Sequence, residues 1–352
     1  MTIRVAVWST GWIGSIAIGA IHDRPDLDLV GVWVHSEDKV GRDAGELAGI
    51  GPIGVTATND VDALVALRPD CVLYAASGPE RDVACVPDYV RILESGINLV
   101  SVSTPSLIFP PAYFPGWRDE MATAAGTGGV TFYASGIEPG FAADHLPLTL
   151  ATQSRRIEAI RCSEIFLYHE YPVAFMMREV MGFGLPLDFD AMLAMPGSQA
   201  AAWGPSIHLV AAALEVEVDE IVERYERAPS PRHIDTASGP IEPGTCGAVR
   251  IETVGIVDGR EAITVEHVNR MASDLSPEWS PGVVDGSYQV TITGEPDISC
   301  RMTVGDPASP TEGGMIATAM RCVNAIPHVV ASEPGLISSL DLPLTLPTNA
   351  FG

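Results

Sequence analysis

The sequence predicts an α/β fold, with a doubly wound parallel sheet and a second α+β domain that contains a largely antiparallel sheet. Three observations carry this prediction. Apolar strand segments alternate with helical segments up to about residue 143, as in doubly wound sheets. A glycine turn at residues 9–14 joins the first strand to the first helix, and strand-forming segments recur from residue 156 onward.

The first domain is expected to cover residues 1–143. Its strands are short apolar runs, and helical stretches follow them along the chain. We expect strands at residues 3–8, 29–34, 71–76, 98–102 and 130–134, and helices from residue 14 to about residue 23 and at residues 82–95.

The second domain is expected to cover residues 144–312. Residues 188–226 are predicted to be largely helical, and within them Glu215–Arg227 is predicted as an acidic amphipathic helix with a solvated face. An apolar helix at residues 313–327 begins a C-terminal segment, residues 313–352, that is expected to return to the first domain. Strands are expected at residues 156–168, on both sides of Asp258-Gly259 within 249–269, and at 288–293 and 298–304.

Composition narrows the class of protein. The 352 residues are 47% hydrophobic, enough for a large core, and no basic-then-apolar leader or run of eighteen apolar residues is seen, so we expect a cytoplasmic protein without a membrane span. A net charge of −25 disfavours nucleic acid and anionic membranes as partners. Six cysteines without a C-x-x-C pair predict buried reduced thiols and no metal site.

The glycine turn predicts a dinucleotide site of the Rossmann type. Gly11 and Gly14 let the backbone turn tightly and present amides at a helix N-terminus, where a pyrophosphate binds. Because serine replaces the first glycine of the usual G-x-G-x-x-G pattern, the prediction of a dinucleotide site depends mainly on the position of this turn between a strand and a helix. We expect cofactor contacts from Ser9, Thr10, Gly11, Trp12, Ile13 and Gly14.

The end of the second strand favours NADP, with NAD as a second usable cofactor. An NAD-specific site carries a carboxylate there, whereas this strand ends in His35 and Ser36 and is followed by Lys39 and Arg42, which can accept a phosphate. Lys39 is the single lysine of the chain. Its position in a turn argues against a Schiff-base or acid–base lysine mechanism.

Two further turns are expected to flank the nicotinamide, because ligands bind outside the carboxyl ends of strands in such sheets. They are SVSTPSLIFP, residues 101–110, and SGIEPGF, residues 135–141; ordinary strand-to-helix loops are the alternative. We expect additional cofactor contacts from Ala76, Ser77, Ser103 and Thr104.

Four stretches together resemble one family: WSTGWIG, DKVGRDAGELAG at residues 38–49, GIEPGF, and ATAMRCVNAIP. The chain is similar to the 2,4-diaminopentanoate dehydrogenase and native amine dehydrogenase family. The resemblance implies a Rossmann domain like that of dihydrodipicolinate reductase and a second domain for substrate binding and dimerisation. It also implies NAD(P)H-dependent reduction of an imine formed from a ketone or aldehyde and ammonia, the reverse oxidative deamination, and a homodimer.

The chain departs from the family at the catalytic position. Where the family has S-T-C-E-E with a catalytic glutamate, this chain has Ser103-Thr104-Pro105-Ser106, and where the family has asparagine, this chain has Glu138. We therefore predict that Glu138 is the catalytic carboxylate, assisted by Ser106. The alternative is that Glu138 only accepts hydrogen bonds from backbone amides or from the nicotinamide carboxamide.

The sequence signals for residues that contact the substrate are weaker than those for the cofactor site. Lone histidines at strand ends are usually structural, and methionines at helical spacing usually belong to a core. Arg161 or Arg178 could bind a substrate carboxylate. We expect the pocket to be lined by Phe141, Tyr168, His169, Met177 and His208.

Two other functions stay open on the sequence. The same fold could reduce an oxo compound without ammonia, since the family glutamate is missing. A non-catalytic NAD(P)-binding regulator is the third hypothesis, and it predicts cofactor binding without turnover.

Overall fold

The computed structural model describes residues 2–76, 84–306, 309–348 and 351. The chain forms two compact units, unit 1 with Met1–Gly140 and Met315–Gly352, and unit 2 with Phe141–Gly314. Within the described residues, no helix combines the length and apolar character needed to cross a bilayer.

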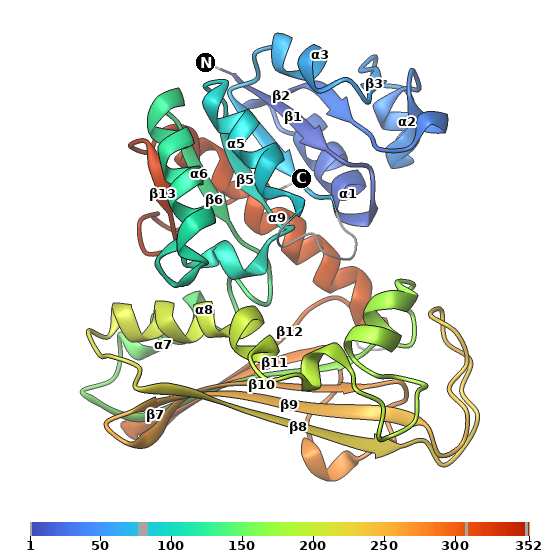
Figure 1. Cartoon of the computed structure of the whole chain (residues 1–352), viewed down its shortest axis with the longest axis vertical. Coiled ribbons are helices and arrows are strands. Elements are labelled where there is room, and N and C mark those ends of the chain that lie inside the picture. Colours follow the sequence, from blue (N-terminus) through green and yellow to red (C-terminus); the bar gives the residue numbers. More distant parts are fainter. Residues whose placement is uncertain (1, 77–83, 307–308, 349–350, 352) are drawn as a thin grey trace. The chain divides into compact units, whose positions relative to one another are not determined.

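Unit 1 is built on a seven-stranded parallel sheet, which confirms the predicted doubly wound fold (Figure 1). The strand order is β13-β6-β5-β4-β1-β2-β3. Two short strands, β3 and β13, were not predicted. The bounds are β1 (Ile3–Trp8), β2 (Leu27–Trp33), β3 (Ala57–Thr58), β4 (Cys71–Tyr74), β5 (Asn98–Ser101), β6 (Thr131–Ala134) and β13 (Gly335–Ile337).

Helices cover both faces of this sheet. Helices α5 (Val86–Glu94) and α6 (Pro115–Gly128) pack on one face, and α1 (Trp12–His22) packs on the other together with α9 (Pro310–Val330), whose residues from Met315 belong to unit 1 (Figure 1). The C-terminal helix therefore lies in the core of unit 1. Shorter helical elements are η1 (Glu37–Lys39), α2 (Ala44–Ala48), α3 (Val61–Ala66), η2 (Pro105–Ile108) and η3 (Pro110–Ala112).

Unit 2 is built on a six-stranded, mostly antiparallel sheet in the order β12-β11-β7-β10-β9-β8, with only β7 and β10 parallel. Asp258 and Gly259, both with positive φ, form the predicted hairpin turn between β9 and β10. The bounds are β7 (Arg156–Leu167), β8 (Glu220–Pro229), β9 (Cys246–Val257), β10 (Arg260–Arg270), β11 (Ser287–Glu295) and β12 (Ile298–Thr303).

One face of the unit 2 sheet is covered by α7 (His145–Ala151) and α8 (Ser198–Ala213) (Figure 1). Side chains of Ile160 and Val265 pack there with Ile207 of α8. The remaining short elements of this unit are a π-helical turn η4 (Met176–Val180), η5 (Met192–Ala194) and η6 (Pro277–Trp279).

The predicted acidic helix at Glu215–Arg227 is wrong. Strand β8 (Glu220–Pro229) begins within this segment and pairs with β9 along its whole length. Ile221, Val222 and Tyr225 are β-branched or aromatic and favour a strand. The charged residues alone are compatible with either an amphipathic helix or a strand, and pairing with a strand distant in the sequence determines the structure.

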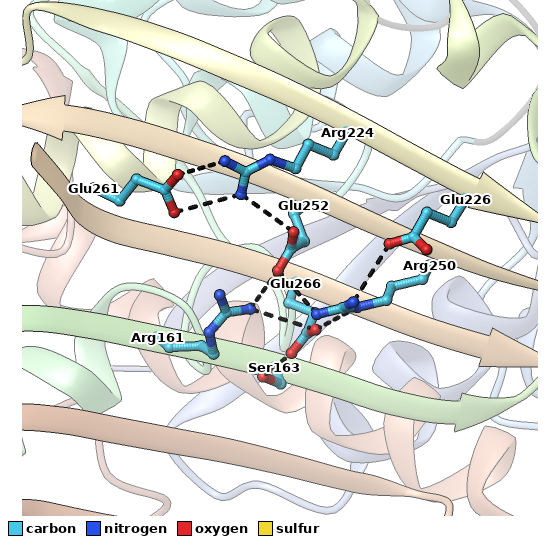
Figure 2. A network of polar contacts seen from close by, with 8 residues as sticks. All are labelled: Arg161, Ser163, Arg224, Glu226, Arg250, Glu252, Glu261 and Glu266. Atoms are coloured by element: carbon cyan, nitrogen blue, oxygen red, sulfur yellow. Dashed lines mark hydrogen bonds and ion pairs between the residues drawn. The ribbon is translucent and has the colours of Figure 1, made fainter. Parts of the chain in front are cut away.

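The charges of β8 instead join an ion-pair network on the face opposite the helices (Figure 2). Glu252 is its centre: its carboxylate accepts from Arg161 at 2.7 Å, Arg250 at 3.1 Å and Arg224 at 3.3 Å. The Glu252 side chain is only 8% exposed. Burial alone would raise the pKa of Glu252, but the arginines together hold it below its ordinary value.

We predict that Glu252→Gln lowers the free energy of unfolding by about 2–3 kcal/mol, because three partly exposed arginines lose their shared anion. Since the folded pKa of Glu252 is lowered, its contribution is complete above its ordinary pKa of 4.5 and is lost as the pH falls through the folded value. Urea unfolding at neutral and acidic pH measures this loss. Glu261→Gln, at an exposed site paired with Arg224, is the control and should have little effect. Equal effects of the two substitutions would contradict the assignment.

Candidate cofactor and active site

The turn between β1 and α1 has the geometry of a phosphate-binding turn. Ser9, at the position of the missing first glycine, has a φ of 95°, in the left-handed region that favours glycine. A Cβ at Gly14 would lie 2.1 Å from the Ser9 carbonyl oxygen, so only glycine lets the helix approach the strand this closely. The N-cap residue of α1, Gly11, provides no side-chain cap, which leaves the first helical amides directed outward.

The structure brings Lys39 to this turn. The Lys39 Nζ atom donates a hydrogen bond to Thr10 Oγ1 at 3.1 Å, so the only ammonium side chain of the protein lies beside the phosphate turn. His35 and Ser36 are exposed at the end of β2. The carboxylate of Glu37, which follows them, accepts a hydrogen bond from Asn59 at 2.8 Å.

The motif at residues 38–49 has a structural explanation. The carboxylate of Asp43 caps helix α2 by accepting from the amides of Gly45 and Glu46, and it also accepts from the amides of Ile53 and Gly54. These backbone hydrogen bonds, led by that of Ile53, lower the pKa of Asp43. The motif therefore shapes the chain between β2 and β3.

Two side-chain hydroxyl groups that follow β5, those of Thr104 and Ser106, were predicted to belong to the site, and they differ in their hydrogen bonding. The Thr104 hydroxyl is buried and bonds to Tyr89 and Cys85, so any cofactor contact of Thr104 must come from its main chain. The Ser106 Oγ atom is also buried, but within the described part of the chain it has no hydrogen-bond partner. A buried hydroxyl without a partner is costly and fits a site that a ligand completes.

The other predicted contacts near these strand ends are placed as follows. Ala76 is buried just after β4, and Ser103 donates to the Tyr74 carbonyl oxygen at 3.4 Å. Ser77 lies outside the described residues.

The turn that carries Glu138 is held by one face of α9. Within unit 1, Thr318 accepts from the Ile137 amide at 3.4 Å, and Arg321 donates to the Gly140 carbonyl oxygen at 3.2 Å. The Cys322 thiol lies 3.3 Å from the carbonyl oxygen of Ser135. Three α9 residues therefore fix both ends of the turn, and Glu138 between them is half-buried.

The residues predicted to line a substrate pocket do not form one group in unit 2. The Phe141 ring stacks on His145, and Met177 is buried in a core cluster at whose edge Tyr168 packs. His169 is partly exposed beside Glu170, and His208 lies on α8, where burial lowers its pKa. Arg161 belongs to the ion-pair network, and Arg178 donates to backbone carbonyls.

The sequence prediction did not include Glu164 of β7, which the structure places in a polar cluster. Its Oε1 atom accepts from Tyr168 at 2.9 Å and from Asn269 at 3.1 Å. Burial raises the pKa of Glu164 to about 7 despite these hydrogen bonds. A signal existed, since Ile160, Cys162 and Glu164 alternate along the strand and share its core face.

Comparison with known proteins gives a consistent result. The model of the 2,4-diaminopentanoate dehydrogenase C-terminal domain matches residues 141–350, and that of the dihydrodipicolinate reductase N-terminus matches residues 3–86. An amine dehydrogenase from Streptomyces virginiae is 40% identical to this chain, with 97% of this chain and 96% of that protein covered. A 2,4-diaminopentanoate dehydrogenase from Acetoanaerobium sticklandii is 25% identical, with 97% and 94% covered.

A solved structure is similar in fold over the same length. The amine dehydrogenase from Mycobacterium smegmatis matches with a TM-score of 0.80 at 21% identity, with 98% of this chain and 97% of that chain covered.

We predict that Gly14→Ala weakens NADPH binding by at least about tenfold, because the new methyl group displaces α1 from the Ser9 carbonyl. Fluorescence titration measures the dissociation constant. The control is Gly19→Ala on the same helix, where the methyl group meets only a contact at 3.8 Å. Unchanged binding by Gly14→Ala would contradict the assignment of this turn.

Proposed function

We propose, from the premise that this chain belongs to the 2,4-diaminopentanoate dehydrogenase family, that it catalyses the reductive amination of small ketones or aldehydes with ammonia, and the reverse deamination. Membership makes it an NAD(P)-dependent oxidoreductase that acts on amino groups. The likeness to amine dehydrogenases along almost the whole chain is the observation that carries the proposal. The cytoplasm is the proposed compartment, which is supported by six cysteines that form no disulfide in the described part of the chain.

The residues present fit a nicotinamide dinucleotide. The close approach at Gly14 and the uncapped start of α1 suit the pyrophosphate, and the buried Ser106 hydroxyl suits a polar ligand atom. When bound, the reduced cofactor supplies a hydride to the carbon of the imine. In this proposal Ser9, Thr10 and the first residues of α1 hold the phosphates, while Ser103 and Ala76 lie toward the nicotinamide end.

Glu138 is the proposed catalytic carboxylate. Amination needs a group that takes a proton from ammonium, leaving ammonia as the nucleophile, and that then faces the cationic iminium. A carboxylate can do both, and the backbone on either side of Glu138 is held by α9, where Thr318 accepts from the Ile137 amide and Arg321 donates to the Gly140 carbonyl oxygen. Ser106 is proposed to assist by bonding the reacting oxygen or nitrogen.

The function itself is tested by following NADPH oxidation with cyclohexanone in the presence and absence of ammonium chloride. Amine dehydrogenase activity requires both substrates, and the amine is recovered as product. Oxidation that proceeds equally without ammonium would favour an oxo reductase. Tight NADPH binding without turnover on a panel of carbonyl compounds and amines would favour a regulator.

Glu138→Gln should lower kcat by at least about 100-fold, because the amide cannot accept the proton. The dissociation constant of NADPH should stay the same. Glu120→Gln, at an exposed position on α6, is the matched control and should behave as wild type. Wild-type turnover by Glu138→Gln would remove this residue from the mechanism.

NADP is the proposed preferred cofactor, because Lys39 lies beside Thr10 and Glu37 is engaged with Asn59. Lys39→Met should raise KM for NADPH by about tenfold, the loss expected for a hydrogen bond to a charged group, and should change KM for NADH far less. Steady-state kinetics with both cofactors provide the comparison. A strong preference of the wild type for NADH would overturn this assignment.

A further inference from the structure

Arg321 of α9 connects the turn that carries Glu138 to a later segment of unit 1. Its Nη2 atom donates to the Gly140 carbonyl oxygen at 3.2 Å, and its Nη1 atom donates to Thr345 Oγ1 at 3.3 Å. Nη2 also donates to the Tyr133 hydroxyl of β6 at 3.5 Å. A single planar guanidinium therefore contacts a strand, the turn and the later segment at once.

Thr345 lies in an irregular segment, residues 342–348, which we call the strap. The strap makes no backbone–backbone hydrogen bond with any residue that the structure describes, so its side chains must hold it in place. Two of its seven residues, Pro343 and Pro347, limit the freedom of the backbone. Ordering such a segment costs conformational entropy, which its side-chain contacts have to offset.

The contacts of the strap recur at every third residue. Three of its side chains contact the rest of unit 1, namely Leu342, Thr345 and Thr348. Leu344 and Leu346, which lie between them, are 63% and 67% exposed. A period of three residues without internal hydrogen bonds is typical of a polyproline II conformation. The strap therefore presents one edge to unit 1 and the other to solvent.

The two threonines of the strap accept from different arginines. Arg24 donates to Thr348 at 3.2 Å, and its other partners are an aspartate before β2 and an asparagine of α9. None of these partners belongs to the turn that carries Glu138. Of the two threonines, Thr345 is the one whose arginine reaches that turn.

Gly140 is the residue at which this turn closes. Its φ is 122°, and a Cβ there would lie 2.2 Å from the Gly136 nitrogen, so the two ends of the turn are in close contact. The Gly140 carbonyl oxygen also accepts from the Ser135 hydroxyl at 3.2 Å. The direction of this carbonyl, which Arg321 helps to set, therefore affects the main chain at Glu138.

We propose that Arg321 is a positioning residue for Glu138 and that Thr345 of the strap holds the Arg321 guanidinium in the required orientation. The inference rests on the proposed function for the role of Glu138. Because the guanidinium is a rigid fork, an acceptor at one nitrogen fixes the direction in which the other nitrogen donates. Without the Thr345 hydroxyl the fork can turn away from Gly140. A displacement of about 1 Å at a catalytic group can cost roughly 100-fold in rate.

Thr345→Val tests this role, because it keeps the shape of the side chain and removes the acceptor. It should lower the single-turnover rate of NADPH oxidation with cyclohexanone and ammonium by about 3- to 10-fold, the loss expected for one hydrogen bond at a half-buried position. The dissociation constant of NADPH should stay the same. Thr345→Ser keeps the hydroxyl and should retain the wild-type rate.

The matched control is Thr348→Val, on the same strap, which removes the same kind of hydrogen bond from Arg24. Both valine variants should lower the thermal midpoint, since each loses a contact of the strap, but Thr348→Val should retain the wild-type rate. Equal losses of rate in the two variants would assign the strap a structural role alone and overturn the proposal. A wild-type rate in Thr345→Val would also overturn it.

A double variant tests whether Thr345 acts through Arg321. Arg321→Lys keeps the positive charge but loses the fork, and it should lower the rate by about 10- to 100-fold. Adding Thr345→Val to Arg321→Lys should lower the rate no further, because the hydroxyl has no guanidinium left to hold. Losses that multiply in the double variant would contradict the proposed coupling.

Hydrogen–deuterium exchange gives a readout that does not depend on turnover. The amides of residues 135–141 should exchange faster in Thr345→Val than in the wild type, and at the wild-type rate in Thr348→Val. This result in a protein without ammonium-dependent turnover would sink the proposed function and keep the role of the strap. Ammonium-dependent turnover, with exchange in Thr345→Val equal to that of the wild type, would overturn the role of the strap and keep the function.

Discussion

The thiol of Cys322 on α9 contacts the main chain at the ends of two neighbouring strands, and the proposed active site of unit 1 depends on the turns that follow these strands. It lies 3.3 Å from the carbonyl oxygen of Ser135 and 3.7 Å from that of Ser101, the residues at which the turns after β6 and β5 begin. Burial raises its pKa to about 12, so it remains a protonated donor. A C-terminal helix therefore sets the positions of two turns that are far earlier in the chain.

The same helix face holds the turn that carries Glu138 through its main chain. Thr318 accepts from a main-chain amide of the turn, Arg321 and Cys322 donate to main-chain carbonyl oxygens, and none of these hydrogen bonds uses the side chain at position 138. The backbone is thus fixed independently of whether asparagine or glutamate stands there. Chemistry at this position can change without a change of scaffold.

In unit 2, the two faces of one sheet use acidic residues in opposite ways. On one face, Glu252 is paired with arginines, which hold its pKa low and make it a structural anion. On the other, Glu164 accepts from the neutral side chains of Tyr168 and Asn269, and burial raises its pKa. A carboxyl group that is buried without a cationic partner contributes little to stability, so the two glutamates contribute differently to the fold.

Much of the fold could be predicted from sequence because short apolar runs and the glycine turn are local signals. The hairpin at Asp258-Gly259 and five of the seven strands of unit 1 follow from such signals, whereas the short strands β3 and β13 do not. Strand β8 could not be predicted, because the spacing of its charged and apolar residues also suits a helix. Only its pairing with β9 makes this segment a strand. The hydrogen bond between Lys39 and Thr10 was not predicted either, because both residues were only expected to contact the cofactor, and Glu164 gained its neighbours Asn269 and Tyr288 from strand register.

The central claim is that the Glu138 carboxylate serves the carbon that receives hydride. A crystal structure of the NADPH complex with a bound amine tests it most directly. The account predicts that a Glu138 oxygen lies roughly 3 Å from the nitrogen of an amine held against nicotinamide C4. A carboxylate that points away from C4, or that only bonds the nicotinamide carboxamide, would contradict it.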